Sequence, residues 1–223
     1  MAAALVFGPE KVSASVEYCK VIDVSGTAEI LESGSALWRP LAVPKLLKAG
    51  DKVRALEKAY VEFSTGDDLS GLMKLGGNSE FEVMGEDLTR FFLRKGIFFI
   101  LREEDGSIVG KQGKEQTLFQ IFTKDLIVSF LGGGSSVSVN DKGTWVRVFS
   151  EHVRANPFDN VSTSEGVLRT VTEGFKFFMK APPEPTVAGP MRMNFSDYSS
   201  WQFWMRQCYQ RKDALSQKFL TKN

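Results

Sequence analysis

Alternation of apolar and polar residues is the main pattern along this chain. It runs through segments such as 59–64, 79–83, 136–139, 146–148 and 175–179. A period of two places one side of each segment in a core and the other side in water, as in a half-buried β-strand. The sequence therefore predicts short strands over most of its length.

Turn-forming residues separate these segments. Clusters of glycine, asparagine, aspartate and serine occur at 66–68, 76–78, 105–107, 132–134 and 140–143. Such residues adopt positive φ or bond their own backbone, and so reverse the chain. Short strands that recur about every 8 to 12 residues predict a sandwich, barrel or solenoid rather than β-α-β units.

Two denser apolar runs, 91–93 and 97–101, differ from the alternating segments. They are too short for helices and too apolar for strands with one wet face, so we expect strands buried on both faces. Gly96 between them predicts a bend or a close approach. Gly174 likewise precedes an apolar strand, and in a stacked β architecture each such glycine would let the chain pass from one sheet to the next.

Beyond residue 180 the pattern changes. The prolines of 182–185 predict an extended strap or linker outside any sheet, because proline fixes φ and lacks an N–H. Apolar residues then recur at helical spacing, at Trp201, Trp204, Cys208, Leu215 and Phe219. They predict one amphipathic helix, with Asp197 or a nearby serine as its cap.

This helix has two interpretations. It either docks on the β-module and completes its core, or it presents Trp201 and Trp204 as a surface for a partner or a membrane. Docking is favoured, because a thin β-module usually needs a cover over an open edge or end.

The charge balance of the chain does not indicate nucleic-acid binding. The 223 residues carry 28 Lys and Arg against 27 Asp and Glu, so no large field attracts a polyanion. No apolar run approaches the roughly 20 residues that span a bilayer. The start of the chain, 1–7, lacks the basic leader of a full signal peptide, and we interpret 1–15 as a stub that processing could have left.

The two cysteines, Cys19 and Cys208, lie near opposite ends of the chain, and neither has metal-site spacing. In an oxidising compartment they could form a disulfide, which would stabilise the fold by roughly 4–5 kcal/mol. The alternative is two reduced, partly buried thiols.

The stretch 46–55 resembles the signature of the FecR-domain family of bacterial envelope proteins. In that signature a leucine is followed by Gly-Asp-x-Val/Ile-Arg, here Gly50, Asp51, Val53 and Arg54. We expect Gly50 to adopt positive φ and Asp51 to accept bonds from N–H groups of the following turn. Val53 should enter the core, and Arg54 should pair with a carboxylate on a neighbouring rung.

The resemblance covers about 16–180. Further segments in the family order lie at 26–30, 38–41, 59–63, 76–83 and 119–123. The chain departs from the pattern at 67–70 and 133–137.

The resemblance implies an all-β fold. We expect a FecR-like β-solenoid or β-sandwich at 16–180, followed by a Pro-rich linker and one C-terminal amphipathic helix at 181–223. It also implies a periplasmic or envelope location and a non-catalytic exported module that binds a protein or the cell wall. The alternative is the periplasmic sensor half of a transmembrane regulator, which restrains a sigma factor and receives its signal from a TonB-dependent transducer.

Catalytic motifs give little support for an enzyme. His152 is the one histidine, and no Gly-x-Ser-x-Gly elbow accompanies it, so we interpret it as an exposed strand-edge residue. Carboxylate pairs at 67–68, 86–87 and 103–105 could serve a carbohydrate-active enzyme, but their contexts favour solvated turns. We expect no catalysis, no cofactor and no metal.

Overall fold

The computed structural model describes residues 19–65, 71–85, 90–102, 119–130, 132–157, 169–180 and 187–220. In this part of the chain, 17 strands precede one C-terminal helix, α1 (Phe195–Leu220). The predicted all-β class is therefore confirmed. All strands belong to one hydrogen-bonded network, which folds into two facing layers.

Layer A contains, in spatial order, β4 (Lys45–Leu47), β1 (Cys19–Ser25), β6 (Tyr60–Thr65), β7 (Gly71–Leu75), the second half of β9 (Arg90–Arg102), β12 (Gly133–Asn140), β13 (Gly143–Ser150), β16 (Phe175–Lys180) and β17 (Val187–Arg192). Layer B contains β3 (Arg39–Pro40), β2 (Ala28–Leu31), β5 (Lys52–Ala55), β8 (Ser79–Met84), the first half of β9, β10 (Phe119–Phe122), β11 (Leu126–Phe130), β14 (His152–Pro157) and β15 (Arg169–Thr172). Among these pairs only β9 and β10 run parallel.

Strand β9 passes from layer B into layer A at Gly96, which has a φ of 92°. A Cβ at this position would lie 1.9 Å from Ser79 Oγ, so only glycine fits. The same hydroxyl accepts the Ile97 N–H at 2.9 Å. The predicted bend at Gly96 is confirmed, and Gly174, with a φ of 80°, turns the chain from β15 in layer B to β16 in layer A.

The corners between the layers lie on two opposite edges. The register pairs Gly96 with Val139 and Gly133 with Arg102, so the corner at Gly133 faces away from the corner at Gly96. Strand β9 therefore joins two halves, β1–β8 and β10–β17. In each half the chain passes between the layers along one edge, and the two edges are opposite. The result is a sandwich rather than a solenoid with one repeated corner.

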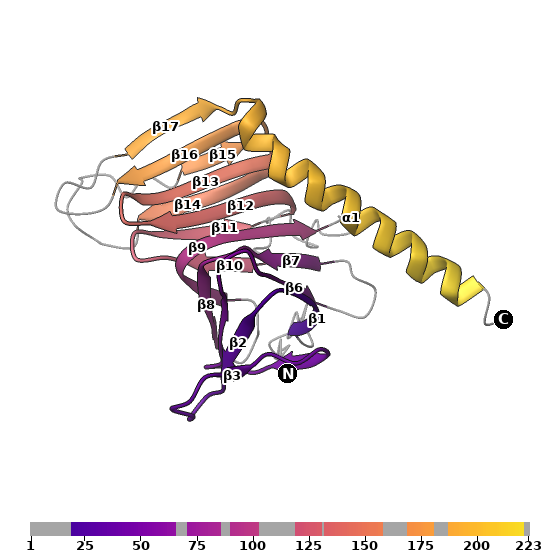
Figure 1. Ribbon diagram of the computed structural model, residues 1–223. Coiled ribbons are helices and arrows are strands. Elements are labelled where there is room, and N and C mark those ends of the chain that lie inside the picture. The colour runs from indigo at the N-terminus through magenta and orange to yellow at the C-terminus, as the bar shows by residue number, and fades with distance from the viewer. Residues whose placement is uncertain are drawn as a thin grey trace, which may run out of the picture.

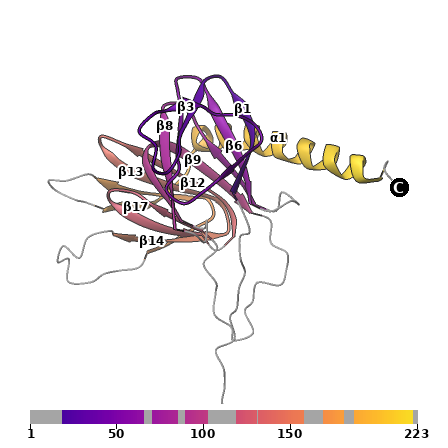
Figure 2. The same cartoon turned by 90° about the horizontal axis from the view of Figure 1, so that it is seen from below.

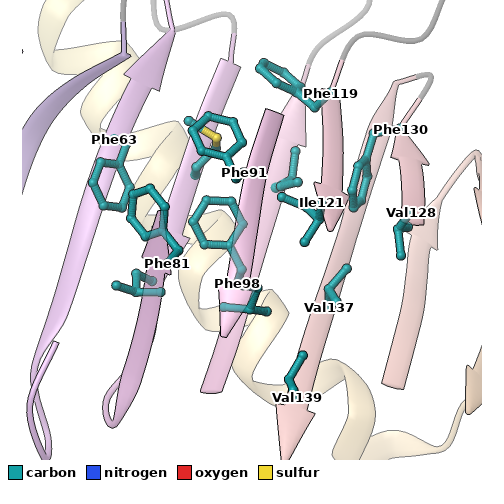
Figure 3. Packing of buried hydrophobic residues seen from close by; sticks show 14 of the residues in the cluster. Phe63, Phe81, Phe91, Phe98, Phe119, Ile121, Val128, Phe130, Val137 and Val139 are labelled. Carbon is teal, nitrogen blue, oxygen red and sulfur yellow. The ribbon is translucent and has the colours of Figure 1, made fainter. Parts of the chain in front are cut away.

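An aromatic row fills the space between the layers (Figure 3). Phe63 of layer A meets Phe81 of layer B edge to face, with ring centroids 5.1 Å apart. Phe91 and Phe98 continue the row at 5.9 Å. We call the buried residues between the two layers the inter-layer core, and they are the apolar halves of the predicted alternating strands.

Helix α1 crosses the outer face of layer A and continues beyond it toward the C-terminus (Figure 1, Figure 2). The position of α1 explains why the second half of β9 is buried on its outer face. Phe99 and Leu101 are buried on the helix side of layer A, as the prediction of two buried faces requires. In layer B the prediction was wrong, because no element of the described part of the chain covers that face over β9: Phe92 is half-buried and Arg94 is exposed.

The region after residue 180 holds a strand that the sequence did not predict. Strand β17 pairs with β16, with Ala188 opposite Phe178, although Pro190 lies within it. The proline is tolerated because β17 is an edge strand, and the register shifts between Lys176 and Phe178. The prolines of 182–185 lie outside the described residues.

Candidate functional site

The Gly50–Asp51 step forms a corner that joins three chain segments. Gly50 has a φ of 86° and donates its N–H to the Val83 carbonyl at 2.9 Å. The Asp51 side chain is buried, and its carboxylate accepts the N–H groups of Ser33 and Lys48, each at 2.9 Å. Both donors precede Asp51, so the expectation that it bonds the following turn was wrong.

The next residues of the signature continue into β5. Val53 is fully buried in the inter-layer core. Arg54 points outward and pairs with Glu29 on the neighbouring strand β2, at 2.5 Å. Its guanidinium carbon lies 4.1 Å from the ring centroid of Trp38. These contacts join separate segments of the chain to one another, which is an architectural role.

Trp201 and Trp204 lie beneath α1 against layer A. They are 6% and 1% exposed, so in this structure the helix is docked and the two tryptophans are not a partner surface. Trp201 stacks on Phe149, with ring centroids 4.5 Å apart and an interplanar angle of 4°. Gly134 leaves room for it, since a Cβ there would lie 2.2 Å from the indole. We call this cluster the helix dock: Leu72, Phe99, Leu101, Phe149, Trp201, Trp204 and Cys208.

Polar groups also tie the helix to layer A. Trp204 Nε1 donates to Glu62 Oε1 at 3.1 Å, and Glu62 is only 2% exposed. Asp197 accepts Arg147 Nε at 3.0 Å and Lys176 Nζ at 2.7 Å. Burial would raise the pKa of Asp197, but hydrogen bonds from Lys176, the Asn194 N–H and Arg147 outweigh it and hold this pKa below its ordinary value.

The cap of α1 differs from the prediction. Asn194 precedes the helix, and its side-chain oxygen accepts the Asp197 N–H at 3.2 Å. Asp197 returns the interaction by accepting the Asn194 N–H at 2.9 Å. This reciprocal pair is a capping box, in which Asp197 is the third helical residue rather than the cap.

The two cysteines lie on opposite faces of layer A. Cys19 belongs to the inter-layer core and Cys208 to the helix dock, and no disulfide joins these buried thiols. A bridge between them would have to pass through the sheet. Burial raises the pKa of Cys19 to about 12, which keeps this thiol protonated and unreactive.

An exposed apolar surface lies at the first end of the sandwich. Leu37, Val43 and Leu46 are 69%, 47% and 54% exposed. Leu37 and Val43 lie on either side of β3, and Leu46 lies in β4. These are the outermost strands of layers B and A. We call these three residues the apolar end. The sequence interpretation missed them, and Leu41 and Leu47 of the same segment are buried.

One ion pair lies beside the apolar end. The Lys45 ammonium donates a hydrogen bond to Glu32, which together with its charge lowers the pKa of that carboxyl. Arg39 and Lys48 are exposed in the same segment, so this surface combines apolar and basic side chains.

His152 begins β14 and is half-buried rather than exposed, and Thr172 lies opposite it. In the described ranges no three His, Cys, Asp or Glu side chains gather as a metal site. The carboxylate pairs at 67–68, 86–87 and 103–105 lie outside those ranges. Within the described residues, no helix has the length and apolar character of a membrane span.

The sequence matches no family model and no curated protein. Two crystal structures from Parabacteroides distasonis ATCC 8503, each provisionally described as an anti-sigma factor, are similar to this chain. The first is 13% identical, with a TM-score of 0.48, over 68% of this chain and 64% of its own. The second is 12% identical, with a TM-score of 0.35, over 77% and 64%. The chain thus spans less than two thirds of the length of either neighbour.

Proposed function

We propose that this chain is a non-catalytic, FecR-like β-module outside the cytoplasm, which acts by contact with a protein and serves as the sensor part of a sigma-factor regulator. The family resemblance through Gly50, Asp51, Val53 and Arg54 supports the assignment. These residues form a corner, a core contact and an ion pair, and so provide a rigid frame rather than a reactive centre.

The apolar end carries the proposal. Single exposed apolar residues are ordinary on a protein surface, but Leu37, Val43 and Leu46 gather within ten residues at one end of the sandwich. A surface of this kind is typical of contact with another protein. The apolar end lies at one end of layer A, and β17, after which the chain enters α1, lies at the other.

The edge strands indicate how a partner would bind. Strand β3 has two residues and β4 has three, so neither offers a long ladder for an added strand. Recognition should therefore depend on the exposed side chains, with Leu46 of β4 and Leu37 at their centre.

Photo-crosslinking in living cells tests this function. A photoreactive phenylalanine analogue at Leu37 or Leu46 should form adducts with the periplasmic part of a TonB-dependent transducer. The same analogue at Tyr209, which is 49% exposed on α1, is the matched control and should not. A sigma-dependent reporter in the same cells should respond to Leu46→Glu.

Three outcomes separate the alternatives. Adducts with a transducer together with a changed reporter support the sensor function. Adducts with another envelope protein and an unchanged reporter would instead indicate a stand-alone scaffold. If Leu37 and Leu46 gave no adduct, or only the adducts seen at Tyr209, the apolar end would not be a binding surface.

A further inference from the structure

The face of layer A beneath α1 is only partly apolar. On the inner side of β6, Val61 and Phe63 enter the inter-layer core. On its outer side Glu62 and Ser64 are buried, at 2% and 1% exposure. Ser136 of β12 lies opposite Phe99 on the same outer side and is fully buried. The same outer face also carries the buried apolar side chains of Leu72, Phe99, Leu101 and Phe149, so it is mixed, whereas the inner face is apolar.

Docking leaves some of these polar atoms without a bond. Ser136 Oγ and Gln207 Oε1 are buried and have no hydrogen-bond partner among the described residues. Ser136 belongs to the covered face and Gln207 to the helix itself, while a third such atom, Ser135 Oγ, lies on the inner face of β12 and is not affected by docking. Ser136 Oγ and Gln207 Oε1 would both be hydrogen-bonded in water, so undocking removes a penalty that the docked state carries.

The attachments of α1 that the structure describes lie between Asp197 and Cys208. They run from the ion pairs of Asp197, through Trp201 and Trp204, to Cys208. The helix then continues to Leu220, beyond the sheet (Figure 1, Figure 2). In the described chain α1 follows the last strand, so no strand has to leave a layer when the helix moves.

We propose that α1 is a releasable cover of layer A. It undocks as a unit while both layers stay folded, and it thereby exposes Leu72, Phe99, Leu101 and Phe149 as a new surface. This inference does not depend on the proposed sensor function, because it concerns one equilibrium within the chain.

The two native cysteines report on this equilibrium separately. Cys208 lies in the helix dock, and Cys19 lies in the inter-layer core. Release of α1 exposes the first thiol only, whereas global unfolding exposes both. The full chain is incubated with N-ethylmaleimide under native conditions, and modification of each cysteine is followed by peptide mass spectrometry. Rates are divided by those of the same cysteines in denaturant.

Cys208 should react at least about tenfold faster than Cys19, since partial opening is more frequent than global unfolding. Asp197→Asn should accelerate Cys208 by a further factor of about ten and leave Cys19 unchanged, because it weakens both ion pairs at the start of the helix. The matched control is Asp141→Asn, at an exposed turn between β12 and β13, which should change neither rate.

Equal rates for the two cysteines would overturn the proposal, because the helix would then leave only when the whole fold unfolds. An equal acceleration of both by Asp197→Asn would do the same. Cys19 also serves as the internal check on folding: a variant that fails to fold exposes it at once.

Discussion

Replacing Gly134 with alanine should loosen the helix dock and leave the inter-layer core intact. The new Cβ would lie 2.2 Å from Trp201 Cζ2 and 2.5 Å from Cη2. Ordinary carbon contacts are about 3.5–4.0 Å, so the indole would have to move by more than about 1 Å. Such a shift disrupts its stacking on Phe149, where the ring centroids are 4.5 Å apart.

Two opposing effects set the magnitude. Overpacking costs about 1–3 kcal/mol, whereas the lost freedom of glycine in the unfolded chain returns about 0.4–1 kcal/mol. We therefore expect Gly134→Ala to lower the free energy of unfolding by about 1–2 kcal/mol. Urea denaturation followed by tryptophan fluorescence and by circular dichroism measures this change.

A double-mutant cycle with Trp201→Ala isolates the cause. Without the indole, the alanine at position 134 has no ring to displace, so Gly134→Ala should then be neutral or slightly stabilising. If Gly134→Ala destabilised both backgrounds equally, the clash with Trp201 would not be its cause. The reasoning about the helix dock would then fail at its tightest contact.

Three further predictions concern the corner, the core and pH. Asp51→Ala leaves the buried N–H groups of Ser33 and Lys48 without their acceptor and should cost roughly 2–4 kcal/mol in urea denaturation, so an unchanged midpoint would contradict the assigned role. Phe91→Ala in the inter-layer core should lower the free energy of unfolding by about 3–5 kcal/mol. Phe195→Ala, at a residue that is 84% exposed, should change it by less than about 0.5 kcal/mol when both variants are compared by thermal denaturation. Because the pKa of Asp197 is lowered in the folded state, its ionised form stabilises the dock above its ordinary pKa, and this stability is lost as pH falls through the folded pKa. Cys208 labelling should therefore accelerate in acid after correction for thiolate content, and Asp197→Asn should reduce that pH dependence.

Local sequence predicted the strands well because period two depends only on neighbouring residues. Val61 and Phe63 face the inter-layer core, as the alternation requires. The bend at Gly96 was also predictable, because a glycine between two apolar strand segments usually marks a bend or a close approach of the backbone. The helical spacing of Trp201 and Trp204 predicted the helix, and the need of a thin β-module for a cover favoured its docking over a free partner surface.

What covers each face could not be predicted in this way. Alternation placed Glu62 and Ser64 on the wet side of β6, yet both are buried, because α1 comes from far along the chain to cover them. The cap at Asn194 and the strand β17 depend equally on tertiary contacts. The exposed apolar end was missed for the same reason, since exposure depends on the edges that the folded layers leave open.

Inside the sandwich, the sequence pattern and the observed burial agree, as in the aromatic row from Phe63 to Phe98. Beneath α1 they agree for Phe99 and Leu101, which the sequence placed in a strand with two buried faces. They conflict there for Glu62 and Ser136, which are polar and yet buried. Local and global preferences usually conflict where a structure is strained or has to move. Because the two ion pairs of Asp197 and the two tryptophans hold α1 over this face, weakening the ion pairs should release the helix before either layer unfolds.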